Sequence, residues 1–194
     1  MNEFLFYSKL GLYHILDWNA LDHLLFLVVL CLPYASKQWR NLIWLITVFT
    51  IGHSISLALS VYGVVRVSSS WIEYLIVVTI MVTALYNMLT AHRAGSDQTF
   101  IVSVISALFF GLIHGLGFSS YFKQITSSLS SKLLPLIEFA LGVELAQLII
   151  GFVIFLISFI IVGLFKVSRR DFILIGSAIV FGVVLPMIIN ATLS

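Results

Sequence analysis

The start of one apolar stretch carries four side chains that could bind a metal ion. In HILDWNALDHLLFL, His14, Asp17, Asp22 and His23 come just before a run of leucine, phenylalanine and valine. Ionisable groups cost about 2.5–3.5 kcal/mol each on entering a membrane, so they usually mark a functional site there. Imidazole nitrogens bind Zn, Ni, Cu and Fe, and carboxylates compensate the charge of the ion. These residue types predict a site for a divalent transition metal.

The composition indicates the kind of protein that positions these residues. Of the 194 residues, 61% are hydrophobic and 9% are charged, whereas a soluble domain carries about 25% charged residues. Most apolar stretches approach the ~20 residues that cross ~30 Å of hydrocarbon as a helix, and none alternates like a barrel strand. We therefore predict an all-α, polytopic membrane protein whose single domain, residues 1–194, is one bundle of about six transmembrane helices. The predicted spans are residues 21–36, 41–63, 71–91, 100–121, 134–165 and 172–190.

The alternating direction of the spans brings further polar residues to the same half of the bilayer. FTIGHSISLALS puts His53 past the middle of the second span, and FFGLIHGLGF puts His114 in the corresponding half of the fourth. IEFALGVELAQ adds Glu144 from the fifth span. Scattered polar residues would not sort to one side, so we predict a single site built by four helices. Its predicted metal ligands are His14, Asp17, Asp22, His23, His53, His114 and Glu144.

The spacing within these motifs leaves one alternative open and makes one prediction about packing. Adjacent Asp22 and His23 point about 100° apart on a helix. Either the site is broad, or one of the two orients a ligand on a neighbouring helix. Gly111 and Gly115 flank His114 at a small-xxx-small spacing, which predicts a close helix crossing that carries this histidine toward its partners.

The distribution of basic residues predicts the orientation. The loops after the first, third and fifth spans carry six Lys or Arg residues, against four on the side of the termini. The positive-inside rule then places both termini outside, and we expect an integral protein of a bacterial inner membrane. The net charge of +2 is spread over the loops and does not indicate nucleic-acid binding. The expected partners are the lipid bilayer and a divalent metal ion, and a homo-oligomer is left open.

Five blocks of the sequence resemble the HupE/UreJ family of small membrane proteins. They are HILDWNALDHLLFL, FTIGHSISLALS, IEYLIVVTIMVTALYN, FFGLIHGLGF and FALGVELAQ. The resemblance implies a nickel or cobalt permease, a role named from hydrogenase and urease gene neighbourhoods. The residues that it carries over are His14, Asp22, His23, His53, His114 and Glu144. DWNALDH is also similar to the His-x4-Asp-His signature of larger nickel/cobalt permeases, but Asp17 stands where the first histidine would be. This departure leaves the ion open among Ni, Co and Zn.

Two functions fit these residues. The favoured one is transport of a Ni/Co-type divalent metal through the predicted site. The alternative is an intramembrane zinc hydrolase with a one-sided active site, in which three histidines leave an open position for an activated water. Its predicted catalytic residues are Asp22, Glu144 and Ser54. Polar residues in the other half of the spans are mild, such as Thr47 and Thr50, which fits a one-sided active site.

Overall fold

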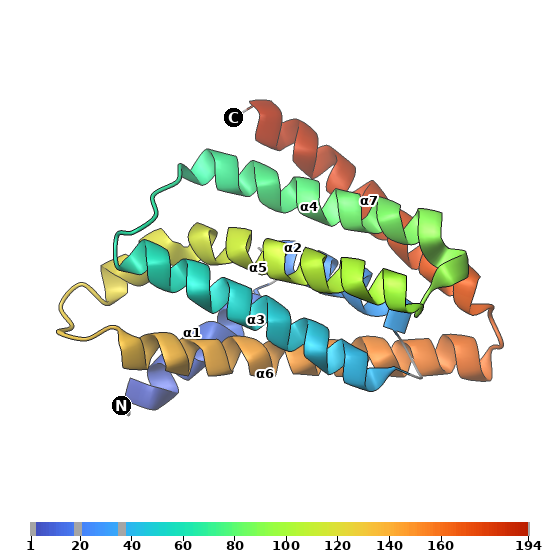
Figure 1. Cartoon of the computed structure of the whole chain (residues 1–194), viewed down its shortest axis with the longest axis horizontal. Coiled ribbons are helices and arrows are strands. Elements are labelled where there is room, and N and C mark those ends of the chain that lie inside the picture. Colours follow the sequence, from blue (N-terminus) through green and yellow to red (C-terminus); the bar gives the residue numbers. More distant parts are fainter. Residues whose placement is uncertain (1–2, 18–20, 35–37, 194) are drawn as a thin grey trace.

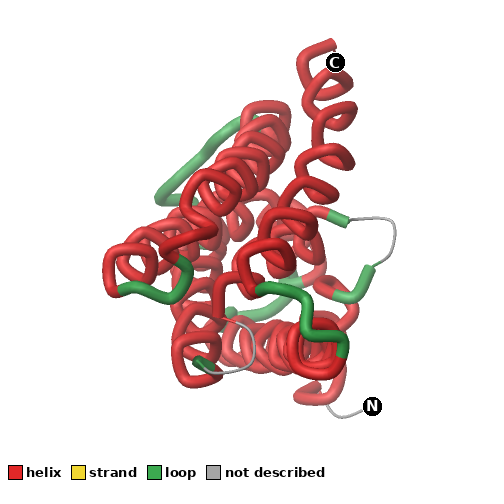
Figure 2. Tube along the Cα trace, turned by 90° about the vertical axis from the view of Figure 1, so that its right-hand side faces the viewer, coloured by secondary structure: helices red, strands yellow, loops and turns green. Residues whose placement is uncertain are grey.

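The computed structural model describes residues 3–17, 21–34 and 38–193, and these residues form helices joined by short loops (Figures 1 and 2). Residues 18–20 of the opening motif and the basic Lys37 lie outside the described residues. The elements in chain order are α1 (Glu3–Ile15), α2 (Asp22–Cys31), the 3₁₀ turn η1 (Leu32–Tyr34), α3 (Trp39–Val61), α4 (Ser69–Thr90), the 3₁₀ turn η2 (Ala91–Arg93), α5 (Asp97–Ile125), α6 (Leu133–Ser158), the π-helical segment η3 (Phe159–Leu164) and α7 (Arg169–Leu193). The predicted all-α class is confirmed.

Five helices in the described part of the chain are long and apolar enough to cross a membrane, so the predicted number of six is wrong. These five segments are Trp39–Val61, Ser69–Arg93, Asp97–Ile125, Leu133–Leu164 and Arg169–Ile189. The predicted span that the structure does not contain is the first, residues 21–36, where it has only the short apolar helix Asp22–Tyr34. Ten α-helical residues cover about 15 Å, roughly half of the hydrocarbon thickness. The protein is therefore an integral membrane protein with five candidate spans.

Two short helices, α1 and α2, occupy the place of the missing span. In Figure 1 they together carry the chain from the left end of the bundle to the right. Helix α2 is buried on nearly all sides, including Phe26, Leu27 and Leu30. A helix that is apolar all round belongs in a core, which explains why a run of residues that reads as a span is enclosed by longer helices.

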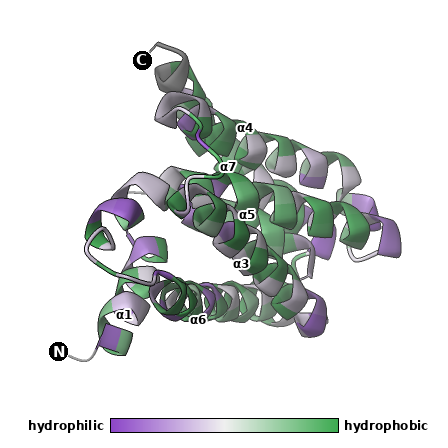
Figure 3. Ribbon diagram, turned by 60° about the vertical axis from the view of Figure 1, so that its left-hand side comes forward, coloured by the Kyte–Doolittle hydropathy of each residue, from purple (hydrophilic) through white to green (hydrophobic). Residues whose placement is uncertain are grey.

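The remaining helices pack largely in pairs around α2. The main pairs are α3 with α5, α1 with α6, and α4 with α7, while α2 contacts α4, α6 and α7. Large apolar side chains such as Ile101, Phe152 and Ile179 point outward from the long helices. Figure 3 shows hydrophobic residues along these helices and many of the hydrophilic ones at their ends. This distribution matches a bundle surrounded by lipid.

Candidate metal centre

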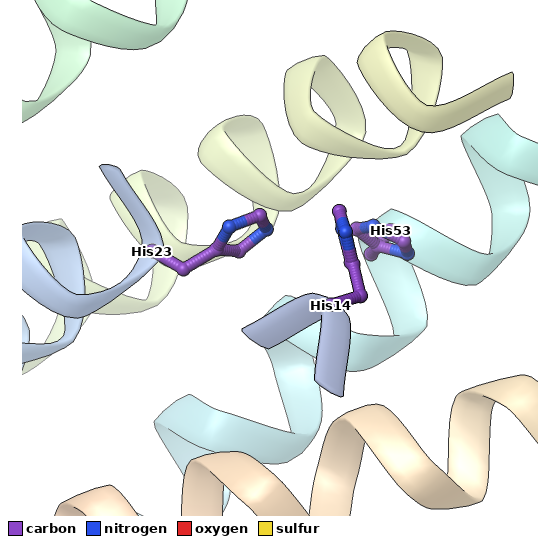
Figure 4. Close-up of side chains that lie close together, drawn as sticks. All are labelled: His14, His23 and His53. Atoms are coloured by element: carbon purple, nitrogen blue, oxygen red, sulfur yellow. The ribbon is translucent and has the colours of Figure 1, made fainter. Parts of the chain in front are cut away.

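Three histidines from three different helices point toward one another (Figure 4). His14 lies at the end of α1, His23 in the first turn of α2, and His53 within α3. One ring nitrogen of each lies within 4.8 Å of the other two. The ring centroids of His14 and His23 are 4.6 Å apart, and those of His14 and His53 are 5.8 Å apart. The break between α1 and α2 brings two of these imidazoles together.

A second group of potential ligands shares His23 with the first. It consists of Asp22, His23 and His114, whose ligand atoms also lie within 4.8 Å of one another. Oδ2 of Asp22 lies 3.1 Å from Nε2 of His114 on α5, and Oδ1 accepts a 2.9 Å hydrogen bond from the backbone N–H of His23. Asp22 therefore contacts a histidine on a neighbouring helix, as one of the two sequence alternatives requires.

The buried ring nitrogens in this cluster lack enough partners. His23, His53 and His114 are 2%, 0% and 3% exposed. Both nitrogens of His53 have no hydrogen-bond partner, and neither do Nε2 of His14, Nε2 of His23 and Nδ1 of His114. Nδ1 of His23 makes no hydrogen bond either, although it lies 3.3 Å from Oδ1 of Asp22. Unpartnered buried polar atoms are costly, and they are rare in folded proteins. A metal ion would satisfy several of them at once, so these residues fit a divalent transition metal.

Phenylalanine rings enclose the imidazoles. Phe110 lies 4.2 Å from His114 and Phe118 lies 4.0 Å from His14, measured between ring centroids. Phe139 stacks on His53 at 5.9 Å, while Phe49 lies within 6.3 Å of His23. The sequence reasoning missed this enclosure although the signal was present. Phe110 and Phe118 come four residues before and after His114, which puts them on the same helix face.

Glycines let the helices approach closely enough to form the cluster. A Cβ atom at Gly115 of α5 would overlap the backbone carbonyl oxygen of His53, and one at Gly111 would overlap that of Phe49. Helix α1 meets α6 in the same way, because a Cβ atom at Gly142 would overlap the carbonyl oxygen of Ser8. The predicted close crossing at His114 is confirmed.

Three predicted site residues lie apart from the two ligand groups. Asp17 is exposed and borders an apolar groove beside Ile15 and Leu24. Glu144 accepts a 2.7 Å hydrogen bond from Thr47 of α3 and lines a groove of about 440 Å³ between α3 and α6, together with Ser54. Their roles as ligands or catalytic groups stay predictions. His92, the remaining histidine, is exposed at the opposite end of the bundle, in η2.

These observations define a helical integral membrane protein with a buried cluster of histidines suited to a metal ion. A scan against protein families matches residues 1–190 to the HupE / UreJ protein family. The chain belongs to this family, and the resemblance that the five sequence blocks indicated is confirmed. Comparison with curated proteins gave no match, and neither did comparison with solved structures.

Proposed function

We propose that this protein transports a divalent transition metal of the Ni/Co type across the membrane, and that the histidine cluster binds the ion. The observation that carries this proposal is the position of His23, which belongs to both ligand groups. An ion bound by His14, His23 and His53 could exchange one or two ligands at a time for those of the neighbouring group. A conducted ion needs several adjacent sites that bind it without trapping it.

The break between α1 and α2 supports transport as well. Transporters commonly build their substrate and ion sites from discontinuous helices whose ends meet inside the membrane. Here His14 ends one short helix and His23 begins the next. Membership of the HupE/UreJ family adds support, since the family resemblance implies nickel or cobalt as the cargo.

An intramembrane zinc hydrolase is the second candidate. Three histidines with a carboxylate nearby are a common donor set of catalytic zinc, and the contact between Asp22 and His114 resembles the carboxylate–histidine pairs around such sites. This candidate is supported less well, because Ser54 and Glu144, two of its predicted catalytic residues, line the groove between α3 and α6.

Metal flux into proteoliposomes separates the two functions. The purified protein is reconstituted, Ni²⁺ or Co²⁺ is added outside, and its arrival is followed with a metal-sensitive dye inside. We expect influx with the wild type and with His92→Ala, which changes an exposed histidine, and none with His53→Ala. Absence of flux together with zinc that stays bound through purification would contradict transport and favour the hydrolase.

We also propose that both termini lie outside a bacterial inner membrane. The six-to-four excess of Lys and Arg on the opposite side supports this orientation. In Figure 1 both labelled ends of the chain lie toward the left, where the α3–α4 and α5–α6 loops also lie. Fusions of alkaline phosphatase, which is active only outside that membrane, at each terminus should both be active. Two inactive fusions would reverse the orientation.

A further inference from the structure

A second polar cluster lies between α3 and α6, and its α3 residues come shortly before His53 in the sequence. It contains Thr47 and Thr50 of α3 with Glu144 and Gln147 of α6. Thr50 precedes His53 by less than one helical turn. Unlike the histidine cluster, this one offers only oxygen atoms to a cation: two hydroxyls, a carboxylate, a side-chain amide oxygen and the carbonyl oxygen of Ile46.

This oxygen cluster has fewer protons than oxygen–oxygen contacts. Oγ1 of Thr50 lies 3.2 Å from the carbonyl oxygen of Ile46 and 3.0 Å from Oε1 of Gln147. The same hydroxyl also contacts Oε2 of Glu144. All three neighbours are acceptors when the carboxylate is ionised, whereas a threonine hydroxyl has a single proton to donate. Exchanging the positions of the oxygen and nitrogen atoms of the Gln147 amide would supply one more proton. One of the three contacts would still have no proton between its two oxygen atoms.

Burial makes this deficit costly. Gln147 is fully buried and Thr50 is 8% exposed. The Nε2 atom of Gln147 is a donor without a hydrogen-bond partner, so it adds a second unmet group to the cluster. Glu144 is half-buried in a helix that crosses the apolar part of the bundle. An ionised carboxylate in such surroundings is stabilised by a compensating positive charge. Among the charged groups with printed contacts, no Lys or Arg side chain pairs with Glu144 in the described part of the chain.

We propose that Thr47, Thr50, Glu144 and Gln147 form a binding site for Na⁺, separate from the histidine cluster. Oxygen-only ligand sets select hard cations, whereas imidazoles select transition metals, so the two clusters would hold different ions. A sodium ion accepts lone pairs from every oxygen around it and neutralises the carboxylate. Thr47, Thr50 and Glu144 also border the groove of about 440 Å³ between α3 and α6.

A role for this ion in driving metal transport follows from the connection through α3. Thr50 would contact the sodium ion while His53, on the same helix, lies in the metal cluster. Occupation of one cluster would then bias the position of the helix that supplies the other. This coupling rests on the proposed transport function, whereas sodium binding itself does not.

Sodium binding is tested on the full-length protein in detergent, in buffer free of sodium and divalent metals. Binding of ²²Na⁺ is measured as NaCl is titrated. We expect saturable sodium binding by the wild type and a similar affinity in Thr50→Ser, which keeps the hydroxyl. In Thr50→Val the affinity should weaken by about tenfold or more, because this variant loses an oxygen that contacts the charged ion. Thr83→Val is the matched control, because the Thr83 hydroxyl also bonds to the carbonyl four residues earlier but lies in α4.

The outcomes separate this site from the proposed transport. Sodium binding that persists unchanged in His53→Ala, where divalent metal binding is weakened, would support two independent sites. A folded wild type that binds no sodium would overturn the proposal. Unchanged sodium affinity in Thr50→Val would overturn it as well. Metal influx that responds to a proton gradient and never to sodium would overturn the coupling alone. A protein that binds sodium but moves no nickel would keep the site and contradict the transport function instead.

Discussion

The side-chain amide of Asn87 donates a 2.6 Å hydrogen bond to the backbone carbonyl of Val29, across the interface between α4 and α2. In a continuous helix this carbonyl would accept from the N–H group four residues later, but that residue is Pro33, which has none. Asn87 therefore supplies the donor that the proline removes. With Asn87 only 3% exposed, no water is at hand to replace it.

Replacing Asn87 should destabilise the protein, because the carbonyl group of Val29 loses its hydrogen-bond donor. We expect Asn87→Leu to lower the free energy of unfolding by about 1–3 kcal/mol, the cost of a buried unsatisfied polar group. Unfolding in detergent micelles measures the change. Pro33→Ala returns an N–H group near Val29, so the double variant should lose less than the sum of the single losses. Strictly additive losses would show that Asn87 acts in some other way.

His23 should matter more for metal binding than any other histidine. His23→Ala leaves neither ligand group complete, whereas His53→Ala leaves the group of Asp22 and His114 intact. We expect calorimetric titration with Ni²⁺ to show no binding by His23→Ala and weakened binding by His53→Ala. His92→Ala should bind like the wild type. If His23→Ala bound nickel as well as the wild type does, His23 would not be a ligand of the site.

The carboxylate of Asp22 should hold His114 in position. Asp22→Asn keeps the size of the side chain but loses the charge that contacts Nε2 of His114. We expect nickel affinity to fall by about 10- to 100-fold, the usual effect of losing a carboxylate that orients a histidine ligand. The same titration measures it, with Asp97→Asn, in the first turn of α5, as the control. Equal affinity in both variants would assign Asp22 no part in binding.

The crossing of α3 and α5 should tolerate no added methyl group at Gly115. Its Cβ atom would overlap the carbonyl oxygen of His53, whereas a Cβ atom at Gly117 would meet only side chains, Ile72 at 3.4 Å and Ile76 at 3.7 Å. We expect Gly115→Ala to lower the free energy of unfolding by about 1–3 kcal/mol through overpacking, and Gly117→Ala to have little effect. Unfolding curves for the pair give the comparison, and equal curves would contradict a tight crossing.

The long helices could be predicted because their sequence signal is strong. Each exceeds the length needed to cross a bilayer, and their boundaries lie within a few residues of the predicted ones. The placement of His23, His53 and His114 together also followed from sequence, since helix direction and depth suffice to assign each of them to one half of the bundle.

The break between α1 and α2 could not be predicted in the same way. The apolar run after Asp22 reads like the start of a span, and only the surrounding helices show that it is a buried core helix. The side of α6 that carries Glu144 was equally hidden. A carboxylate at the right depth can face the histidines or the neighbouring groove, and helix rotation decides between them.

The phenylalanine enclosure decides how firmly the histidine cluster can hold an ion. Asp22 is the one carboxylate in the two ligand groups, so it cancels one of the two charges of a divalent ion, and neutral imidazoles cancel none. The remaining charge would lie among the rings of Phe49, Phe110 and Phe139, where the low dielectric screens it poorly. Such residual charge would lower the affinity of the cluster for a divalent ion. The enclosure thus favours a site that binds its ion weakly over one that stores it.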